Sequence, residues 1–340
     1  MKILVIGGTR FIGAALVKEL ATMGHDVAIL NRGQTPGNPP DGVQRITGDM
    51  NQLAAAREAV IAFAPDVTIH NMPLHPQHIT DLQAIVRGVA SRMVMTSSMD
   101  VYRAFGRVLG TDPGPLLPVP SDEDAPLRES RYPYRSSTTD PADRYYNYDK
   151  IPAEEAAMND PNLPGTVLRL PMVIGPGDYR NRLFPFVRPM QDNRPAIVID
   201  EGYARWQSTY GYIDNVAHAM ALACTDERAS GRIYNIGEHP APWLELGEKV
   251  KAVMDWPGEL VTAPGEKLPE SLRVMMNVAQ DLVCSMERIT AELGYRDVVP
   301  FDEGVRRTVE WQKDNPPDPI PDDQLNYAAQ DEALRNLRTD

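Results

Sequence analysis

Residues 7 to 13 read GGTRFIG, and they follow the apolar run KILVI at residues 2 to 6. In the segment after them, apolar residues recur every three or four positions, which predicts an amphipathic helix. A strand, a glycine-rich turn and a helix in this order place backbone N–H groups where a pyrophosphate can bind. Gly7 and Gly13 fit the outer glycines of such a turn, so the stretch predicts a dinucleotide site.

Strand-like and helix-like segments alternate through the first hundred residues. Five short runs rich in Val, Ile and Thr predict buried parallel strands: KILVIG, DVAILN, VQRITGD, DVTIHN and RMVMTSS. Helical stretches between such strands make right-handed crossovers. We therefore predict an α/β fold, with a doubly wound parallel (Rossmann) sheet and a smaller mixed α/β substrate lobe toward the C-terminus.

Composition divides the chain into three parts. Residues 1–170 are expected to form the dinucleotide-binding domain, including a loop at 103–144 that is rich in proline and acid. Residues 171–313 are expected to form mainly the substrate lobe, interleaved with the first domain, and one strand is expected over GTVLRLPMVIG at 165–175. Residues 314–340 are acidic, and we expect a poorly ordered tail that ends in a short helix.

The end of the second predicted strand indicates which dinucleotide binds. An NAD-binding fold commonly has Asp or Glu there to accept a hydrogen bond from the ribose 2′-hydroxyl, whereas this chain has Asn31 and Arg32. A guanidinium can bind a 2′-phosphate that a carboxylate would repel, so NADP is favoured and NAD remains possible. Arg10, in the middle of the glycine turn, would lie near Arg32 and add to this selection.

Two alternatives stay open at the cofactor site. Arg32 is either a phosphate ligand or a solvated surface residue, and Asp49 either accepts from the adenine amino group or caps the next helix. The residues expected to contact the cofactor are Gly7, Thr9, Arg10, Phe11, Ile12, Gly13, Asn31, Arg32, Asp49, Met50, Pro171 and Val173.

Two further segments predict catalytic chemistry. TSSMDVY at 96–102 ends the fifth strand, at the sheet edge where ligands bind, and Tyr146 and Lys150 are spaced to share one face of a helix. An ammonium beside a phenol favours the phenolate, so Lys150 would lower the pKa of Tyr146. Ser98 would then hydrogen-bond the reacting oxygen while Tyr146 transfers a proton and hydride moves to or from nicotinamide.

Charge and composition exclude several classes of protein. Lys and Arg total 34 against 47 Asp and Glu, a net charge of −13, which argues against broad binding of nucleic acid or membranes. Cys224 and Cys284 form no metal or disulfide pattern, and the histidines around residues 70–78 are expected to line a pocket rather than hold a metal. The chain opens directly on a strand, so we expect a cytoplasmic protein.

The combination of motifs resembles the extended short-chain dehydrogenases/reductases, in the NAD(P)-dependent epimerase/dehydratase family. The resemblance rests on GGTRFIG, TSSMDVY, SDEDAPL, YNYDKIPAE, LRLPMVIGPGD, YGYIDNVAHA and YNIG, within residues 1 to 240. It implies that Ser98, Tyr146 and Lys150 form the catalytic set and that Pro171–Val173 approach the nicotinamide. It also implies a homodimer and a carbohydrate-like substrate bearing a secondary alcohol or carbonyl.

Departures from the family pattern leave the substrate open. Met172 stands where many nucleotide-sugar enzymes have asparagine, and Ser208 stands where they have arginine, although Arg205 could substitute. GGTRFIG followed by NRG is also reminiscent of RNA-binding members of the family. The alternative to an enzyme is therefore a cofactor-bound binding or regulatory protein, which the intact catalytic set disfavours.

Overall fold

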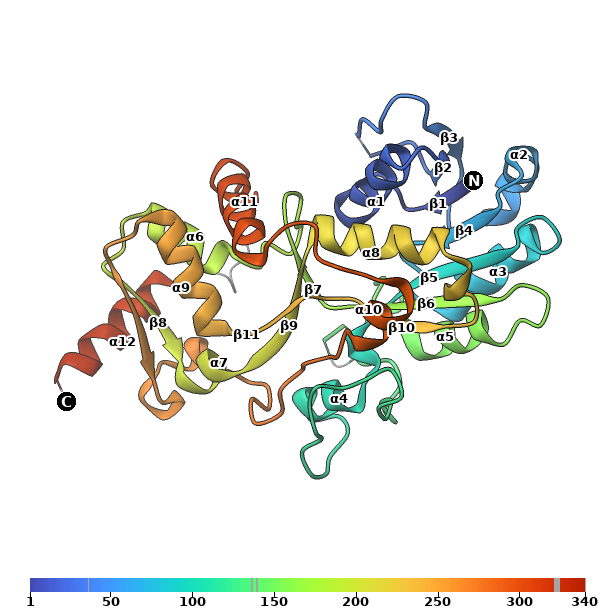
Figure 1. Cartoon of the computed structure of the whole chain (residues 1–340). Coiled ribbons are helices and arrows are strands. Elements are labelled where there is room, and N and C mark those ends of the chain that lie inside the picture. Colours follow the sequence, from blue (N-terminus) through green and yellow to red (C-terminus); the bar gives the residue numbers. More distant parts are fainter. Residues whose placement is uncertain (36, 136, 139, 321–324, 340) are drawn as a thin grey trace.

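The computed structural model describes residues 1–35, 37–135, 137–138, 140–320 and 325–339. Its largest element is a seven-stranded sheet in the order β10-β6-β5-β4-β1-β2-β3, in which every neighbouring pair is parallel. The strands are β1 (Lys2–Ile6), β2 (Asp26–Asn31), β3 (Gln44–Thr47), β4 (Val67–His70), β5 (Arg92–Ser98), β6 (Gly165–Leu170) and β10 (Ile233–Asn235). The doubly wound sheet predicted from the sequence is confirmed (Figure 1).

The strand order reverses beside β1. From this strand the chain builds outward through β2 and β3 on one side, and then through β4, β5 and β6 on the other. In an open parallel sheet, ligands bind at the carboxyl ends of the strands where the order reverses. The candidate site is therefore expected where β1 and β4 end.

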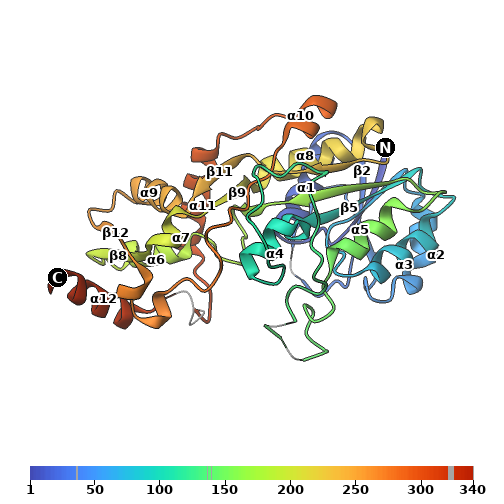
Figure 2. The ribbon, with the colours of Figure 1, turned by 90° about the horizontal axis from the view of Figure 1, so that it is seen from below.

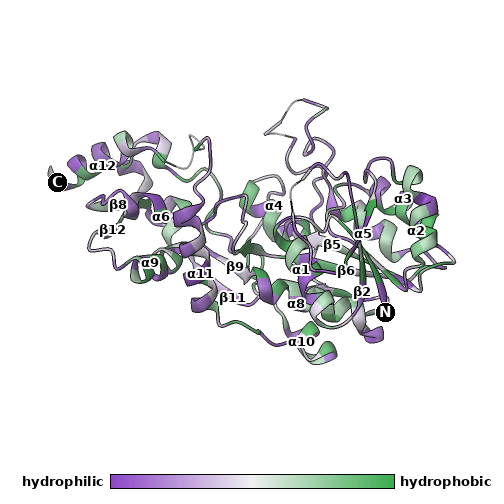
Figure 3. Ribbon diagram, turned by 90° about the horizontal axis from the view of Figure 1, so that it is seen from above, coloured by the Kyte–Doolittle hydropathy of each residue, from purple (hydrophilic) through white to green (hydrophobic). Residues whose placement is uncertain are grey.

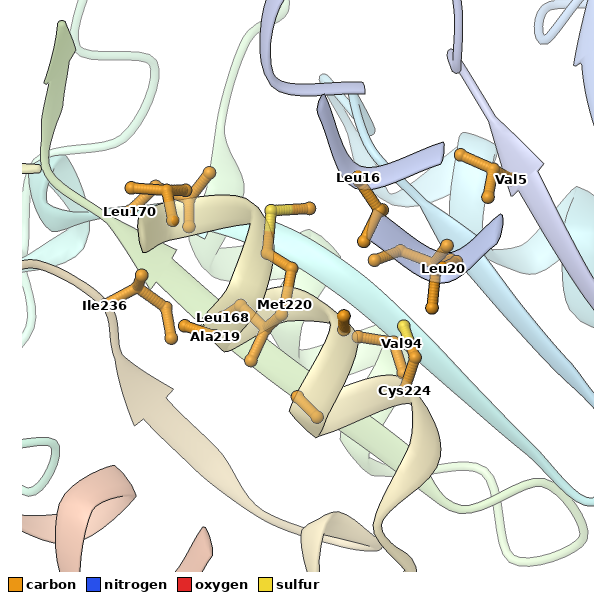
Figure 4. Packing of buried hydrophobic residues seen from close by; sticks show 14 of the residues in the cluster. Val5, Leu16, Leu20, Val94, Leu168, Leu170, Ala219, Met220, Cys224 and Ile236 are labelled. Carbon is orange, nitrogen blue, oxygen red and sulfur yellow. The ribbon is translucent and has the colours of Figure 1, made fainter. Parts of the chain in front are cut away.

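Helices cover both faces of the sheet. One face packs against α1 (Phe11–Thr22) and α8 (Ile213–Thr225), and the other against α2 (Arg57–Phe63), α3 (Pro76–Val86) and α5 (Lys150–Met158). Figure 4 shows the first of these cores, where Leu16 and Leu20 of α1 lie near Met220 and Cys224 of α8. This buried apolar surface holds the start of α1 against the sheet.

A smaller lobe extends from the carboxyl side of the sheet (Figure 2). It contains a three-stranded sheet of β7 (Met172–Ile174), β9 (Gln207–Tyr212) and β11 (His239–Pro242), and a parallel pair of β8 (Ala196–Asp200) and β12 (Glu259–Ala263). Its helices are α6 (Phe184–Gln191), α7 (Glu201–Arg205), α9 (Trp243–Met254) and α11 (Phe301–Asp314), while α10 (Glu287–Leu293) contacts β10 of the main sheet. No described helix is long and apolar enough to span a bilayer.

Pro171 divides a segment that was expected to be one strand. Residues 165–170 pair with the main sheet as β6, and 172–174 pair with β9 as β7. Proline has no N–H to donate to a ladder, so the strand ends there and the chain enters the second lobe. Hydrophobic residues are concentrated in the strands of the main sheet and in parts of the helices that cover it (Figure 3).

One helix lies where little regular structure was expected, and another lies where the sequence predicted a short helix. The loop at 103–144 begins with α4 (Arg103–Leu109), whose Ala104 and Val108 are buried in an apolar cluster. The short helix expected at the end of the tail is α12 (Tyr327–Thr339), and it packs on β8. There the Gln330 side chain accepts from the Val198 N–H at 2.6 Å and donates to the Val198 carbonyl at 3.1 Å.

Candidate active site

The glycine turn joins β1 to α1 in the way its sequence predicts. Gly7 has φ of +87°, a conformation that side chains rarely adopt. A Cβ on Gly13 would lie 2.0 Å from the Gly7 carbonyl oxygen and 2.8 Å from Asn71 Nδ2, so only glycine permits this approach. Arg10 is the N-cap residue of α1, and its side chain makes no capping hydrogen bond, which leaves the helix N-terminus open to an anion.

Several buried polar atoms without partners lie at the carboxyl ends of the parallel strands. Among the described residues, these atoms include Asn31 Nδ2 at the end of β2, His70 Nε2 and Asn71 Oδ1 at the end of β4, and Ser97 Oγ and Asp100 Oδ1 at the end of β5. Buried polar groups are normally hydrogen-bonded, and leaving one unpaired costs about 1–3 kcal/mol. The riboses and phosphates of a dinucleotide offer matching donors and acceptors at this edge of the sheet.

The other expected cofactor residues lie on or near the glycine turn and the ends of the neighbouring strands. Phe11 has φ of 44°, rare for a residue with a side chain, and its ring meets Tyr179 edge to face at 6.1 Å between centroids. Thr9 lies beside Gly37, and Arg10 and Arg32 are both exposed. Ile12 and Met50 pack at the edges of the two cores, whereas Pro171 lies at the junction of β6 and β7.

Two of these expected contacts already have partners within the protein. Asp49 Oδ1 accepts from the Asn51 N–H at 2.9 Å and from Asn51 Nδ2 at 3.0 Å, in the turn that leads to the 3₁₀ helix η1 (Leu53–Ala56). The N-cap residue of η1 is Gln52 and no side chain caps this helix, so both alternatives for Asp49 stay predictions. Val173 is buried, and its carbonyl accepts from Arg182 Nη1 at 2.9 Å.

Ser98 and Lys150 are held at the same edge of the sheet. Ser98 is the last residue of β5, and its Oγ accepts from the Asp100 N–H at 3.2 Å. Lys150 is buried as the first residue of α5, and its Nζ donates to the carbonyls of Pro73 at 2.6 Å and Thr96 at 3.1 Å. Burial lowers the pKa of Lys150 to about 8, although the nearby carboxylates of Asp100 and Glu154 favour the charged form.

Tyr146 does not share a helix face with Lys150, contrary to the expectation from their spacing. Asp149 caps α5 by accepting from the Ile151 N–H at 3.2 Å, and its other oxygen accepts from the Tyr132 N–H at 3.1 Å. These bonds fix the helix start at Lys150, so Tyr146 lies in the preceding turn. Its ring lies over the Arg135 guanidinium, 4.7 Å from the ring centroid.

A different tyrosine bonds to the aspartate that contacts Ser98. The Tyr148 hydroxyl donates to Asp100 Oδ2 at 2.8 Å, and the Asp100 N–H donates to Ser98 Oγ. Tyr134 donates to the same Asp100 oxygen at 3.1 Å. The cluster of Asp100, Tyr134 and Tyr148 was not predicted from the sequence. Asp100 belongs to no recognisable motif apart from lying two residues after Ser98, and Tyr134 lies in a segment without periodicity.

A second buried network, also missed, joins β6, α5 and β10 of the main domain to the loop at 103–144. Arg169 makes two parallel bonds to Glu154, at 3.1 Å to Oε1 and 2.7 Å to Oε2. It also donates to the Tyr102 hydroxyl at 3.0 Å and to the Glu123 carbonyl at 2.9 Å. Tyr102 in turn donates to Asn235 Oδ1 at 2.6 Å.

Three histidines support the turn that holds Lys150. His78 Nδ1 accepts from the Leu74 N–H at 3.1 Å, and its Nε2 is 2.9 Å from Asn51 Oδ1. His75 and His70 stack on either side of the His78 ring, at 3.9 and 5.6 Å between centroids. Among the described residues, no group of three or more His, Cys, Asp or Glu is arranged to hold a metal ion.

We expect the protein to lose stability as the pH falls from 7.5 to 5. Burial, with His75 and Lys150 as further causes, lowers the pKa of His78 from 6.5 to about 4. Between pH 6.5 and pH 4, His78 is protonated in the unfolded chain but stays neutral in the folded chain, because protonation of Nδ1 would break the bond to Leu74. This difference costs about 2 kcal/mol by pH 5. Urea unfolding at both pH values measures it.

The matched variants are His78→Gln and His218→Gln. The first should reduce the loss of stability between pH 7.5 and 5, leaving the part due to buried His70, whose pKa is also lowered by burial. The second changes a partly exposed histidine beside Glu19 and should leave the loss unchanged. Equal pH dependence in the wild type and His78→Gln would contradict the prediction.

The doubly wound sheet and the glycine turn are those of a dinucleotide-binding enzyme. More specifically, the chain belongs to the NAD dependent epimerase/dehydratase family, whose model matches residues 3–237.

The chain is similar to two reductases over most of its length. It is 27% identical to 2′-dehydrokanamycin reductase of Streptomyces kanamyceticus, over 80% of this chain and 72% of the relative. It is 28% identical to 2-alkyl-3-oxoalkanoate reductase of Stenotrophomonas maltophilia, over 90% and 98% of the two chains. The fold is also that of the epimerase Mth375 from Methanothermobacter thermautotrophicus, with a TM-score of 0.69, 20% identity and 92% of each chain covered.

Proposed function

We propose that this protein is an NADP-preferring oxidoreductase that acts on a secondary alcohol or its carbonyl in a sugar-like substrate. The observation that supports it best is the placement of Ser98 and Lys150 beside the unpaired polar atoms at the ends of β4 and β5. Net reduction of a carbonyl is favoured over epimerisation, because two similar chains carry the names of reductases.

The proposed chemistry follows from what each side chain can do. The bound cofactor supplies or accepts the hydride. Ser98 hydrogen-bonds the reacting oxygen, Lys150 supplies positive charge beside it, and Tyr146 transfers the proton. For Tyr146 to do so, the turn before α5 has to bring its hydroxyl to Ser98, because the ring stacks on Arg135 in this structure.

The substrate lobe favours a sugar or keto compound without a nucleotide. Arg205, the residue that could replace the arginine missing at Ser208, has an exposed side chain that pairs with Glu201 in its own helix. Met172, where many nucleotide-sugar enzymes have asparagine, packs in apolar clusters. These two positions therefore give little support to recognition of a nucleotide diphosphate.

Oxidation of NADPH followed at 340 nm tests the proposal. The purified protein would be supplied with keto sugars and with 2-alkyl-3-oxoalkanoates, and formation of the alcohol would be measured against NADPH consumed. Equal amounts of both are expected for a reductase. Interconversion of stereoisomers without consumption of cofactor would indicate an epimerase, and no hydride transfer to or from any compound would contradict the proposal.

Arg10 and Arg32 are expected to select NADP. Replacing Arg10 with glycine or Arg32 with aspartate should lower the ratio of kcat/KM for NADPH to that for NADH by about 10- to 100-fold, the value of one hydrogen bond between charged groups. Arg228→Gly, an exposed arginine in the turn after α8, is the matched control and should leave the ratio unchanged. An unchanged ratio in both site variants would mean that neither guanidinium meets a 2′-phosphate.

A further inference from the structure

The Asp100 carboxylate is satisfied on one side only. Its Oδ2 accepts from the hydroxyls of Tyr148 and Tyr134, whereas Oδ1 is buried without a hydrogen-bond partner among the described residues. The side chain is only 5% exposed, so water does not supply the missing bond from bulk solvent. A buried carboxylate oxygen in this position can accept a hydrogen bond from a ligand donor.

Asp100 lies within reach of the atom at which the reaction is proposed to occur. Its N–H bonds to Ser98 Oγ at 3.2 Å, and its Oδ2 accepts from the Tyr148 hydroxyl at 2.8 Å. The first of these bonds holds Asp100 next to Ser98 at the end of β5. A substrate whose reacting oxygen meets Ser98 would present a neighbouring carbon to Asp100.

The charges around Asp100 favour a neutral donor. Burial raises the pKa of the Asp100 carboxyl, whereas Arg128 and Lys150 favour its carboxylate form. Arg128 is buried beside Asp100 and donates to the backbone carbonyls of Asp100 and Ser130. Positive charge is therefore already present at the site. A hydroxyl can complete the hydrogen bonding of Oδ1, whereas an ammonium group would add a further cation.

We propose that Asp100 is a specificity-determining residue, whose Oδ1 accepts a hydrogen bond from a hydroxyl on the substrate carbon next to the reacting carbon. The inference rests on the proposed function and narrows its substrate class to α-hydroxy ketones and vicinal diols. Tyr134 comes from a largely exposed segment and is only half-buried. Its side chain can therefore move away from Asp100 when a substrate binds.

A pair of matched ketones tests the proposal. The rate of NADPH oxidation would be compared for 2-hydroxycyclohexanone and cyclohexanone, which differ only in the neighbouring hydroxyl. The wild type is expected to prefer the hydroxy ketone in kcat/KM by about tenfold or more, as expected for a hydrogen bond to a charged group. Asp100→Ala should reduce this preference to about twofold or less, whatever its effect on the absolute rates with the two ketones.

Two further variants control for folding. Asp100→Asn keeps the volume and one acceptor for the tyrosines, and it should also weaken the preference. Asp112→Asn changes another buried aspartate, whose oxygens accept from the N–H groups of Glu129 and Ser130, and it should leave the preference intact. A wild type without preference, or an Asp100→Ala variant that keeps it, would overturn the inference.

Binding without turnover separates this inference from the proposed function. Saturation-transfer NMR with the NADP-loaded protein would compare cis-1,2-cyclohexanediol with cyclohexanol. Stronger binding of the diol that disappears in Asp100→Ala supports the role of Asp100 even if neither ketone is reduced, in which case only the proposed reaction fails. Diol binding that is independent of Asp100 would refute the inference even if both ketones are reduced.

Discussion

Replacing Arg169 with methionine is expected to lower the free energy of unfolding by about 3–5 kcal/mol. The guanidinium is 2% exposed and bonds to Glu154, Tyr102 and the Glu123 carbonyl. Methionine can fill part of the space, but it leaves the Glu154 carboxylate buried without its cation. An uncompensated buried charge costs far more than the loss of an exposed ion pair. Urea unfolding at pH 7.5 measures the change.

The double variant Arg169→Met with Glu154→Leu separates the charge from the packing. Removing both ions should recover much of the lost stability, because the penalty comes from the carboxylate left alone. Arg228→Met, which removes an exposed guanidinium paired with Asp226, should change stability by less than about 1 kcal/mol. A loss that small for Arg169→Met itself would show that water or a rearrangement satisfies Glu154.

The Arg169 network marks the limit of what the sequence predicted. Gly7 and Gly13 could be interpreted correctly because their meaning is local: a turn and a close approach between adjacent elements. Arg169 joins partners that are 15 to 67 residues away in the chain, and no periodicity connects them. The role of Asp100 could not be predicted for the same reason, because its partners Tyr134 and Tyr148 lie 34 and 48 residues further along the chain.

The start of α5 could not be predicted from its residues alone. The spacing of Tyr146 and Lys150 suits a helix, and the segment YYNYDKIPAEEAAM has a helical pattern. Asp149 decides the boundary, because its carboxylate bonds to Ile151 within the helix and to Tyr132, 17 residues earlier. A capping residue with a tertiary partner overrides a local pattern. Pro171 shows the converse case, where a single residue without an N–H ends a strand.

Lys150→Met is expected to reduce kcat for hydride transfer by about 10²- to 10³-fold, the usual contribution of a group that assists proton transfer. Methionine retains most of the apolar stem, and it removes a buried ammonium that is costly to desolvate. Removing the ammonium should therefore stabilise the fold, but the carbonyls of Pro73 and Thr96 lose their donor, which cancels part of this gain. We expect the folded protein to persist, which a thermal unfolding curve beside that of Lys18→Met, an exposed lysine of α1, would check.

The pH profile distinguishes a chemical role of Lys150 from a structural one. Because burial lowers the pKa of this lysine to about 8, the wild type should lose activity as the pH rises through 8 and the ammonium gives up its proton. Lys150→Met should be much slower at every pH, and its rate should no longer fall above pH 8. Lys18→Met should show the same fall above pH 8 as the wild type. If Lys150→Met were slow but retained the same loss above pH 8, the lysine would serve only to hold Pro73 and Thr96 in place, and another group would titrate in the reaction.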